Sequence, residues 1–362
     1  MDSQSSSLDF AVIGHQDNWQ TITSFVNAVR YPGSDKLSTE KLKDIYPFIP
    51  PRGLFRVNVR SKTGIEINGV YIDTFIDPDK LGNSHIRANI NKVMKAISLT
   101  KKINAKMVAL GGFTSIVMEG NFDPLEPCNT AFTTGNTLTA AYIVKGIEQA
   151  SASLNINLSD SNVLIIGATG DIGLACTHYL KHKVKKLLLC ARNIQRLEKL
   201  AATLLLENIS VVSSTSLNEL VAEADIIISA ASSSGIKLVN YKKNVLICDA
   251  GYPKNLETKI ENNSGFNLFH GGMGQVHAGF SFNPDYSASI YKYAAPYIIH
   301  GCILEAMVLA FENRSEPYSN GKGNITCTAI DAIYDLSIKH GITVAPFYNT
   351  NGLWHDRSSL KI

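Results

Sequence analysis

The sequence predicts an α/β protein whose centre is a doubly wound parallel sheet, and two observations support this. Short, mostly apolar runs alternate with stretches of helical periodicity, at 162–166, 187–190, 209–213, 226–230 and 245–248. This alternation is typical of parallel strands covered by helices on both faces. A glycine-rich turn at 167–173 also joins the first of these runs to a helix. Together they favour a Rossmann-like sheet.

The glycine turn indicates a dinucleotide-binding site. Its glycines are spaced G-x-x-G-x-x-G, which lets the chain turn tightly, brings backbone N–H groups to a pyrophosphate and packs the helix against the strand. A glycine triplet alone is often only a tight turn, but this one lies between a clear strand and a clear helix. We therefore expect the whole turn to bind the cofactor: Gly167, Ala168, Thr169, Gly170, Asp171, Ile172 and Gly173.

The end of the second strand favours NADPH over NADH. NAD sites usually place an acid here to bond the ribose hydroxyls, but this strand ends in Ala191, Arg192 and Asn193. Arginine matches the geometry of a 2′-phosphate, although a surface arginine capping the turn would look the same. Later strand ends supply further candidate cofactor contacts, namely Ala230, Ala231, Ser232, Asp249 and Gly251.

Composition excludes several classes of function. The chain has 362 residues, enough for two or three domains, and a net charge of only +3, which gives no reason to expect nucleic acid. Its six cysteines show no metal-binding spacing and suit a reducing compartment. The N-terminus lacks a signal peptide, and no run approaches the ~20 apolar residues of a membrane span. We expect a cytoplasmic protein without a metal site.

Further strands and helices flank the predicted sheet on both sides in the sequence. A strand at 9–14, a hairpin at 54–76 and helices at 84–103 and 137–153 precede the sheet, and helices at 296–312 and 326–340 follow it. A Tyr-x-x-x-Lys pattern, at Tyr179 and Lys183, occurs in short-chain dehydrogenases. We interpret it as chance, because it lies on the first helix after the glycine turn.

One face of the helix at 84–103 is basic. It carries Arg87, Lys92, Lys95, Lys101 and Lys102, and no acid occurs from Lys80 to Met118. A solvated face is the simpler interpretation. A face of one sign is also what docking an acidic partner requires.

Two small, polar, glycine-rich segments suit the lining of a pocket. They are 111–115 and 132–137, and they supply Ser115, Thr133, Thr134 and Asn136 as candidate donors to a substrate. As helix caps and turns the same residues would look no different.

Several segments together resemble the aldehyde-forming acyl-[acyl-carrier-protein] reductases of cyanobacterial alkane synthesis. The matching segments are Ala109-Leu-Gly-Gly-Phe-Thr-Ser-Ile116, Phe132-Thr-Thr-Gly-Asn-Thr137, the glycine turn, Ala191-Arg-Asn193, Gly251-Tyr-Pro-Lys-Asn-Leu256, Cys302 with Glu305-Ala-Met307, Phe311-Glu312, Asn324-Ile-Thr326 and His340-Gly341. The resemblance covers nearly the whole chain. It implies an acyl carrier protein as acyl donor and NADPH as reductant, and it leaves open an aldehyde-consuming enzyme downstream.

The resemblance implies that Cys302 is the nucleophile. In such a family the thiolate attacks the acyl thioester, hydride reduces the acyl-enzyme, and an aldehyde leaves. Taken alone, a cysteine in an apolar helix is most often a small core residue. A thiolate needs an electropositive neighbour, such as Lys254, a helix N-terminus or a histidine. His277 or His270, on a glycine-rich loop, could supply the histidine, and each is equally plausible as a surface residue. We expect Glu305 to be paired or turned away, and His300 to face away on a regular helix.

The resemblance implies three regions: an N-terminal substrate and carrier domain (1–136), an NADPH-binding Rossmann-like domain (137–285) and a helical C-terminal segment with the nucleophilic cysteine (286–362). The chain departs from the family at 313–320, where aromatic residues are usual, so a polyketide or coenzyme A thioester stays open as the substrate. Two other functions also stay open. One is an alcohol or hydroxy-acid dehydrogenase without a covalent step, and the other is a nucleotide-binding scaffold without catalysis.

Overall fold

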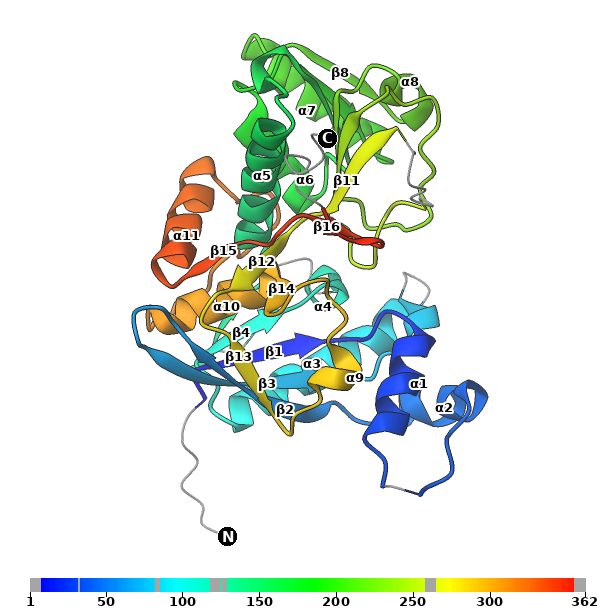
Figure 1. The fold of residues 1–362 in the computed structure, drawn as a ribbon, viewed down its shortest axis with the longest axis vertical. Helices are drawn as coiled ribbons and strands as arrows, with labels where there is room; N and C mark the ends of the chain where they lie inside the picture. The colour runs from blue at the N-terminus through cyan, green and yellow to red at the C-terminus, as the bar shows by residue number, and fades with distance from the viewer. Residues whose placement is uncertain are drawn as a thin grey trace, which may run out of the picture.

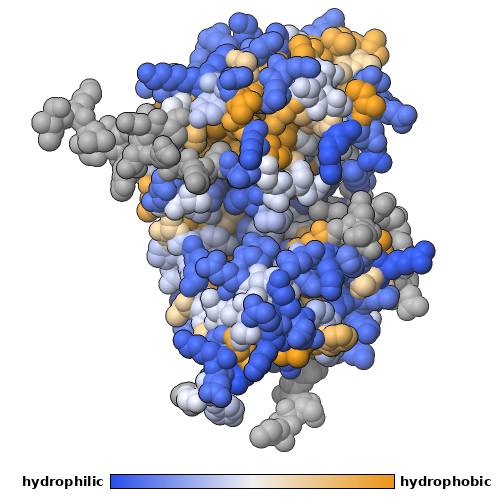
Figure 2. Space-filling model, turned by 90° about the vertical axis from the view of Figure 1, so that its right-hand side faces the viewer, coloured by the Kyte–Doolittle hydropathy of each residue, from blue (hydrophilic) through white to orange (hydrophobic). Residues whose placement is uncertain are grey.

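Two six-stranded sheets form the two lobes of the molecule (Figure 1). This computed structural model describes residues 8–31, 33–81, 85–117, 125, 129–257 and 265–354. No helix in these ranges is long and apolar enough to cross a membrane. The two lobes are also distinct in the space-filling view, where hydrophilic residues dominate the lower one (Figure 2).

The first sheet has the order β13-β2-β3-β1-β4-β5. Its strands are β1 (Phe10–Gly14), β2 (Arg52–Arg60), β3 (Glu66–Asp73), β4 (Met107–Leu110), β5 (Ala131–Thr133) and β13 (Phe280–Asn283). Strand β1 is parallel to β3 and β4, whereas β2 is antiparallel to β3, as the predicted hairpin requires. Alternate side chains of β1 and β4 enter two cores, one shared with α3 (Ile86–Lys102) and the other with α10 (Gly301–Phe311).

The second sheet is wholly parallel, with the order β11-β10-β9-β6-β7-β8. Its elements in chain order are α5 (Asn136–Ser153), β6 (Asn162–Ile166), α6 (Asp171–Leu180), β7 (Lys186–Cys190), α7 (Ile194–Leu206), β8 (Val211–Ser214), α8 (Leu217–Val221), β9 (Ile226–Ser229), β10 (Val245–Asp249) and β11 (Phe266–His270). The strand order reverses at β6, so the glycine turn lies at the topological switch point. The predicted doubly wound sheet is confirmed.

The region after residue 285 is less helical than predicted. Helix α11 (Cys327–Lys339) is present, but Ile298–His300 form strand β14, so α10 begins only at Gly301. Tyr297 has a φ of +59°, which no helix accommodates, and the strand pairs antiparallel with β12 (Met273–Val276). The remaining short elements are α1 (Trp19–Ala28), α2 (Thr39–Ile45), α4 (Phe113–Val117), α9 (Ser287–Ile290), β15 (Ile342–Val344), β16 (Tyr348–Asn349) and β17 (Gly352–Leu353).

The predicted boundary at residue 285 also needs correction. Strand β13 lies before that boundary, yet it pairs with β2 of the first sheet from Phe280↔Val59 to Asn283↔Arg56. The chain therefore returns to the first lobe before residue 285, and α10 then packs on the same sheet. Cys302 reaches the junction of the lobes because of this return.

Candidate active site

Cys302 is the second residue of α10. His300, just before the helix, is extended (φ −64°, ψ 140°), and Gly301 packs so closely on α5 that a Cβ there would lie 2.8 Å from the Thr139 Cα. The Cys302 side chain is half-buried. Since the first-turn N–H groups of a helix carry partial positive charge, this position favours a thiolate in a way that the predicted mid-helix position does not.

Glycines from two strand ends of the first sheet pack against Cys302. A Cβ at Gly135 would lie 2.1 Å from the Cys302 Cα, and Gly135 has a φ of +72°. A Cβ at Gly111 would lie 3.9 Å from the Cys302 Sγ. The chain after β4 and the turn before α5 therefore approach the sulfur as backbone, which leaves N–H groups rather than side chains beside it.

His15 supports the segment that follows β4. Its imidazole is 4% exposed; the Phe113 N–H donates to its Nε2 at 3.1 Å, and its Nδ1 lies 3.1 Å from the Gln16 carbonyl oxygen. This pair of contacts assigns the proton to Nδ1 and leaves Nε2 as an acceptor. Burial lowers the pKa of His15, so the ring is neutral at pH 7 and holds Gly112 and Phe113 in place.

Aromatic rings close over the same place, one from the second lobe and one from the segment before β14. The Tyr252 ring lies 4.6 Å from that of His300 and 5.7 Å from that of His15, and the Tyr293 ring lies 5.9 Å from His300. Tyr252 follows β10 of the second sheet, whereas His15 follows β1 of the first. The carboxyl ends of the two sheets therefore meet around Cys302.

The free protein holds the Cys302 thiol protonated. Burial raises its pKa to about 11; hydrogen bonding by the backbone of Gly112 and Ile303 opposes the rise, and the Glu305 carboxyl adds to it. At pH 7 roughly one thiol in ten thousand is ionised. The position at the start of α10 therefore does not offset the effect of burial on this thiol.

Glu305 is paired, as expected. The Thr133 hydroxyl and the Ser319 hydroxyl (2.7 Å) donate to its Oε1, and the Leu138 N–H donates to its Oε2 at 2.7 Å. Burial raises the pKa of this carboxyl, and these bonds oppose the rise. Because Leu138 lies in the first turn of α5, the carboxyl of Glu305 caps that helix from α10.

The four predicted substrate-binding residues surround the site but already bond within the protein. The Thr133 hydroxyl donates to Glu305, the Thr134 hydroxyl to the Ser319 carbonyl oxygen at 2.9 Å and the Ser115 hydroxyl to the Gly112 carbonyl oxygen at 2.8 Å. The Asn136 amide donates to Asp171 of the glycine turn at 2.8 Å. These bonds commit the four side chains to shaping the site.

The glycine turn has the shape that a pyrophosphate needs. Gly167 has a φ of +85°, and a Cβ there would lie 2.7 Å from the Ala230 carbonyl oxygen; a Cβ at Gly173 would lie 2.2 Å from the Gly167 carbonyl oxygen. The N–H groups of Asp171 to Gly173 have no partner within α6, and Gly170 supplies no side-chain cap. A dinucleotide phosphate fits this backbone.

Arg192 lies beside this turn. Its guanidinium is exposed and donates to the Ser232 hydroxyl at 3.0 Å. This bond brings together two of the predicted cofactor contacts, one after β7 and one after β9. Asn193 accepts from the Arg196 N–H at 2.9 Å and caps α7, while Ala191 is buried. Of the three residues at this strand end, Arg192 alone directs a charged side chain outward.

Asp249 shapes a loop rather than facing a cofactor. It is 2% exposed, and its carboxylate accepts from the backbone N–H groups of Gly251 and Asn255 (both 3.1 Å) and Leu256 (3.0 Å). A buried carboxylate with three backbone donors is committed to the loop. The Asp249 carboxylate therefore holds the loop that carries Tyr252, and the cofactor contact predicted for Gly251 stays a prediction.

Lys254 influences the site through the effect of its charge on a histidine. Its Nζ donates to the Asp249 carbonyl oxygen at 3.2 Å. Burial and the Lys254 charge lower the pKa values of His300 and His270 to about 3, so both rings are neutral at pH 7. The charge of Lys254 therefore disfavours protonation of the His300 ring, which lies beside Tyr252.

His277 does not lie beside Cys302, contrary to expectation. Strand β12 pairs with β14 at Met273↔His300 and runs away from there, so His277 lies four residues further along, about 13 Å of extended chain. Its exposed imidazole is 2.9 Å from the Thr343 hydroxyl. The glycine-rich composition of this segment suggests a loop, whereas Met273–Val276 form strand β12.

The sequence interpretation missed His15, Tyr252 and the true position of His300. His15 and Tyr252 share one signal, since each lies within three residues of the carboxyl end of a parallel strand, where α/β proteins bind ligands. His300 carried no such signal, because the apolar run around it resembles a helix. In the described ranges no group of three His, Cys, Asp or Glu side chains is arranged to hold a metal ion.

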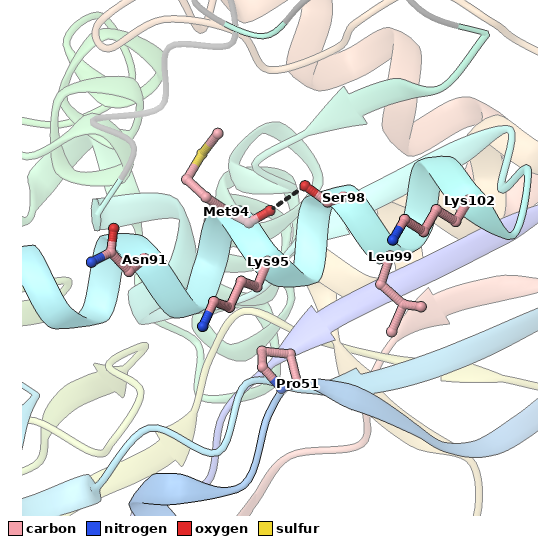
Figure 3. Close-up of a pocket in the computed structure, with 7 residues that line it drawn as sticks. All are labelled: Pro51, Asn91, Met94, Lys95, Ser98, Leu99 and Lys102. Atoms are coloured by element: carbon pink, nitrogen blue, oxygen red, sulfur yellow. Dashed lines mark hydrogen bonds between the residues drawn. The ribbon is translucent and has the colours of Figure 1, made fainter.

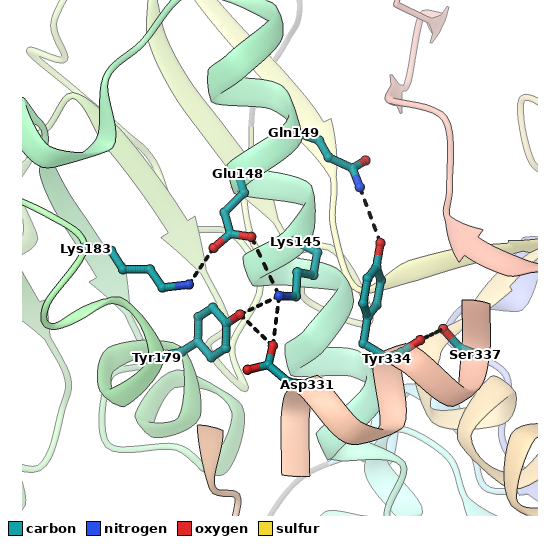
Figure 4. Close-up of polar contacts among 8 residues, drawn as sticks. All are labelled: Lys145, Glu148, Gln149, Tyr179, Lys183, Asp331, Tyr334 and Ser337. Carbon is teal, nitrogen blue, oxygen red and sulfur yellow. Dashed lines mark hydrogen bonds and ion pairs between the residues drawn. The ribbon is translucent and has the colours of Figure 1, made fainter. Parts of the chain in front are cut away.

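The Tyr179 and Lys183 pair belongs to a surface network (Figure 4). The Tyr179 hydroxyl donates to Asp331 at 2.8 Å and accepts from Lys145, while Lys183 pairs with Glu148 at 2.7 Å. These contacts join α5, α6 and α11 away from the sulfur. They support our interpretation that the sequence pattern is not catalytic.

Comparison with known proteins gives three findings. The profile of the Shikimate / quinate 5-dehydrogenase family matches residues 148–270. A long-chain acyl-[acyl-carrier-protein] reductase of Synechococcus elongatus is 34% identical over 92% of this chain and 97% of its own, and the aminotransferase PigE of Serratia sp. is 28% identical over 80% of this chain but 34% of its own. Among solved structures, glutamyl-tRNA reductase from Methanopyrus kandleri overlaps 52% of this chain and 47% of its own, with 19% identity and a TM-score of 0.29.

Proposed function

Because this chain belongs to the family of long-chain acyl-[acyl-carrier-protein] reductases, we propose that it reduces a carrier-bound acyl thioester to an aldehyde through an acyl-enzyme on Cys302. One observation supports the proposal above the others. Cys302 begins a helix at the point where the carboxyl ends of both sheets meet, within reach of the lobe that carries the glycine turn.

Acyl transfer comes first. The Cys302 sulfur attacks the thioester carbonyl carbon; a new C–S bond forms, the bond to the carrier sulfur breaks, and the carrier thiol leaves with the proton that Cys302 gives up. The backbone N–H groups of Gly112 and Ile303, beside the sulfur, are the donors for the developing oxyanion. His15 acts as a positioning residue, because it holds Phe113 and hence Gly112.

Reduction follows on the same sulfur. When bound, a reduced nicotinamide supplies hydride to the acyl carbon. The resulting thiohemiacetal collapses as the carbonyl reforms and the C–S bond breaks, so the aldehyde leaves and the Cys302 thiolate takes a proton from solvent. Residues 167–173 would hold the pyrophosphate, and Arg192 with Ser232 would hold the 2′-phosphate that makes the cofactor NADPH. The rings of Tyr252 and Tyr293, which lie against His300, would form one side of the space that the acyl carbon occupies.

The covalent step is testable directly. The protein is incubated with an acyl-carrier thioester, first without and then with NADPH, and its intact mass and the aldehyde are measured. We expect one acyl group on Cys302 in the first stage and aldehyde in the second. Cys302→Ser should lose both, whereas Cys327→Ser, a change at an exposed cysteine, should retain both. Aldehyde formation by Cys302→Ser would instead favour a dehydrogenase without a covalent step.

A further inference from the structure

An open groove of about 530 Å³ runs along α3 on the first lobe (Figure 3). Its lining combines apolar and cationic side chains, namely Pro51, Asn91, Met94, Lys95, Ser98, Leu99 and Lys102. Asn91, Lys95, Ser98 and Lys102 recur every three or four residues and so form one stripe along the helix. The groove is shallow and elongated along α3, a form suited to a helix rather than to a small molecule.

The charge of this groove has one sign. Helix α3 contains no acid, and Lys95 and Lys102 are both exposed. No carboxylate of the described residues lies within 4 Å of either ammonium group. Since neither cation pairs with a carboxylate in the part of the chain that the structure describes, their field is directed at whatever occupies the groove.

Lys92 does not belong to this surface, although the basic-face prediction included it. Its half-buried Nζ donates to the Ile49 carbonyl oxygen at 3.1 Å and to the Phe75 carbonyl oxygen at 2.5 Å, and burial lowers its pKa to about 8. These bonds fasten α3 to the segment that leads into Pro51. Lys92 thus builds the wall of the groove, which makes the groove a fixed feature.

Apolar side chains provide contact area between and beside the lysines. Met94 is 37% exposed, Leu99 is partly exposed, and Phe48, three residues before Pro51, is 85% exposed. A phenylalanine this exposed is unusual in a monomer surface unless a partner covers it. Lysines around a small apolar strip are suited to an acidic, amphipathic helix.

The groove is connected to the nucleophile by one short helix. Helix α3 packs against α4, and α4 begins at Phe113, directly after the Gly112 backbone beside the Cys302 sulfur. A protein seated on α3 therefore docks on the lobe that holds Cys302.

We propose that the α3 groove is the docking surface for the acyl donor, and that this donor is an acidic carrier protein which presents a helix to Lys95 and Lys102. The inference rests on the proposed function, because that function requires a protein to deliver the thioester. The charge of the groove adds what the reaction alone does not specify, namely where the carrier binds and which charge it carries there.

The test is Lys95→Glu with Lys102→Glu, measured with two substrates. With the acyl-carrier thioester we expect KM to rise on the order of tenfold while kcat is kept, and the parent KM to rise with ionic strength. With the acyl thioester of N-acetylcysteamine, which has no protein surface, we expect no change. The matched control is Lys185→Glu with Lys243→Glu, two exposed lysines at the amino ends of β7 and β10, which should leave both substrates unaffected.

The outcomes separate the two proposals. An unchanged carrier KM in the groove variant, or an equal rise in the control variant, would overturn the docking surface. Failure of the parent protein to reduce either substrate would instead overturn the proposed function. If the double glutamate variant fails to fold, Lys95→Gln with Lys102→Gln removes the same charges, and we expect it to show a smaller rise in KM for the carrier substrate alone.

Discussion

His15→Ala tests how the sulfur is held. The change deletes the imidazole Nε2 that accepts from the Phe113 N–H at 3.1 Å, in a place where His15 is 4% exposed. A buried N–H without a partner costs about 1–3 kcal/mol. If the unpaired N–H destabilises by this amount the arrangement in which Gly112 contacts the sulfur, the rate of Cys302 acylation should drop. The expected drop is roughly 5- to 150-fold, since each ~1.4 kcal/mol is tenfold.

The assay is single-turnover acylation of Cys302, followed by intact mass, alongside thermal unfolding and NADPH titration. We expect slower acylation with unchanged NADPH affinity, because His15 follows β1 of the first sheet. His15→Gln is the rescue variant: its amide oxygen can accept from the Phe113 N–H, and the rate should recover. Since burial lowers the pKa of His15, parent and glutamine variant should share one pH profile from pH 6 to 8. A folded His15→Ala variant that acylates at the parent rate would refute this reasoning.

Three other predictions follow from the same geometry. Alkylation of Cys302 by iodoacetamide, mapped by peptide mass, should rise roughly tenfold per pH unit from pH 7 to 9.5, because the rate follows the thiolate and the pKa of the thiol is raised to about 11; a plateau near pH 8 would contradict this. Gly135→Ala should unfold or inactivate the protein, since the new Cβ would lie 2.1 Å from the Cys302 Cα, whereas Gly64→Ala, also at positive φ but in open space, should cost only about 1 kcal/mol in the free energy of unfolding. Arg192→Ala should raise KM for NADPH about 10- to 100-fold and leave KM for NADH unchanged, measured by initial rates; equal effects on both cofactors would remove the 2′-phosphate role.

Local pattern was sufficient for most of the fold. The strands of the second sheet are apolar and bounded by turn residues, and α3 has a clear stripe, so their existence followed from periodicity. The start of α10 did not, because Ile298, Ile299 and Cys302 form one apolar run that suits a helix or a buried strand equally. The left-handed conformation of Tyr297 and the pairing with β12 decide between them, and both depend on residues distant in the sequence.

Dependence on residues distant in the sequence also explains the errors in the predicted site. Thr133 and Asn136 were identified from composition, which shows that a segment is polar but not where its donors point; one bonds Glu305 and the other Asp171. His277 is close in sequence to a glycine-rich segment, which predicts a place near the site. The register of β12 instead puts it at the end of the strand that is far from His300. By contrast, Gly167 and Gly173 were predictable, because a turn with no room for a Cβ requires glycine at these positions.

Glu305 shows that stability and reactivity compete at this site. Its carboxyl closes the amino end of α5 through Leu138 and joins Thr133 to Ser319, so its removal would leave the buried Leu138 N–H and the Thr133 hydroxyl without this acceptor. One turn away, the same carboxyl raises the pKa of Cys302. A group added for reactivity alone would be a cation. Glu305 therefore stabilises the amino end of α5 while it raises the pKa of the neighbouring thiol.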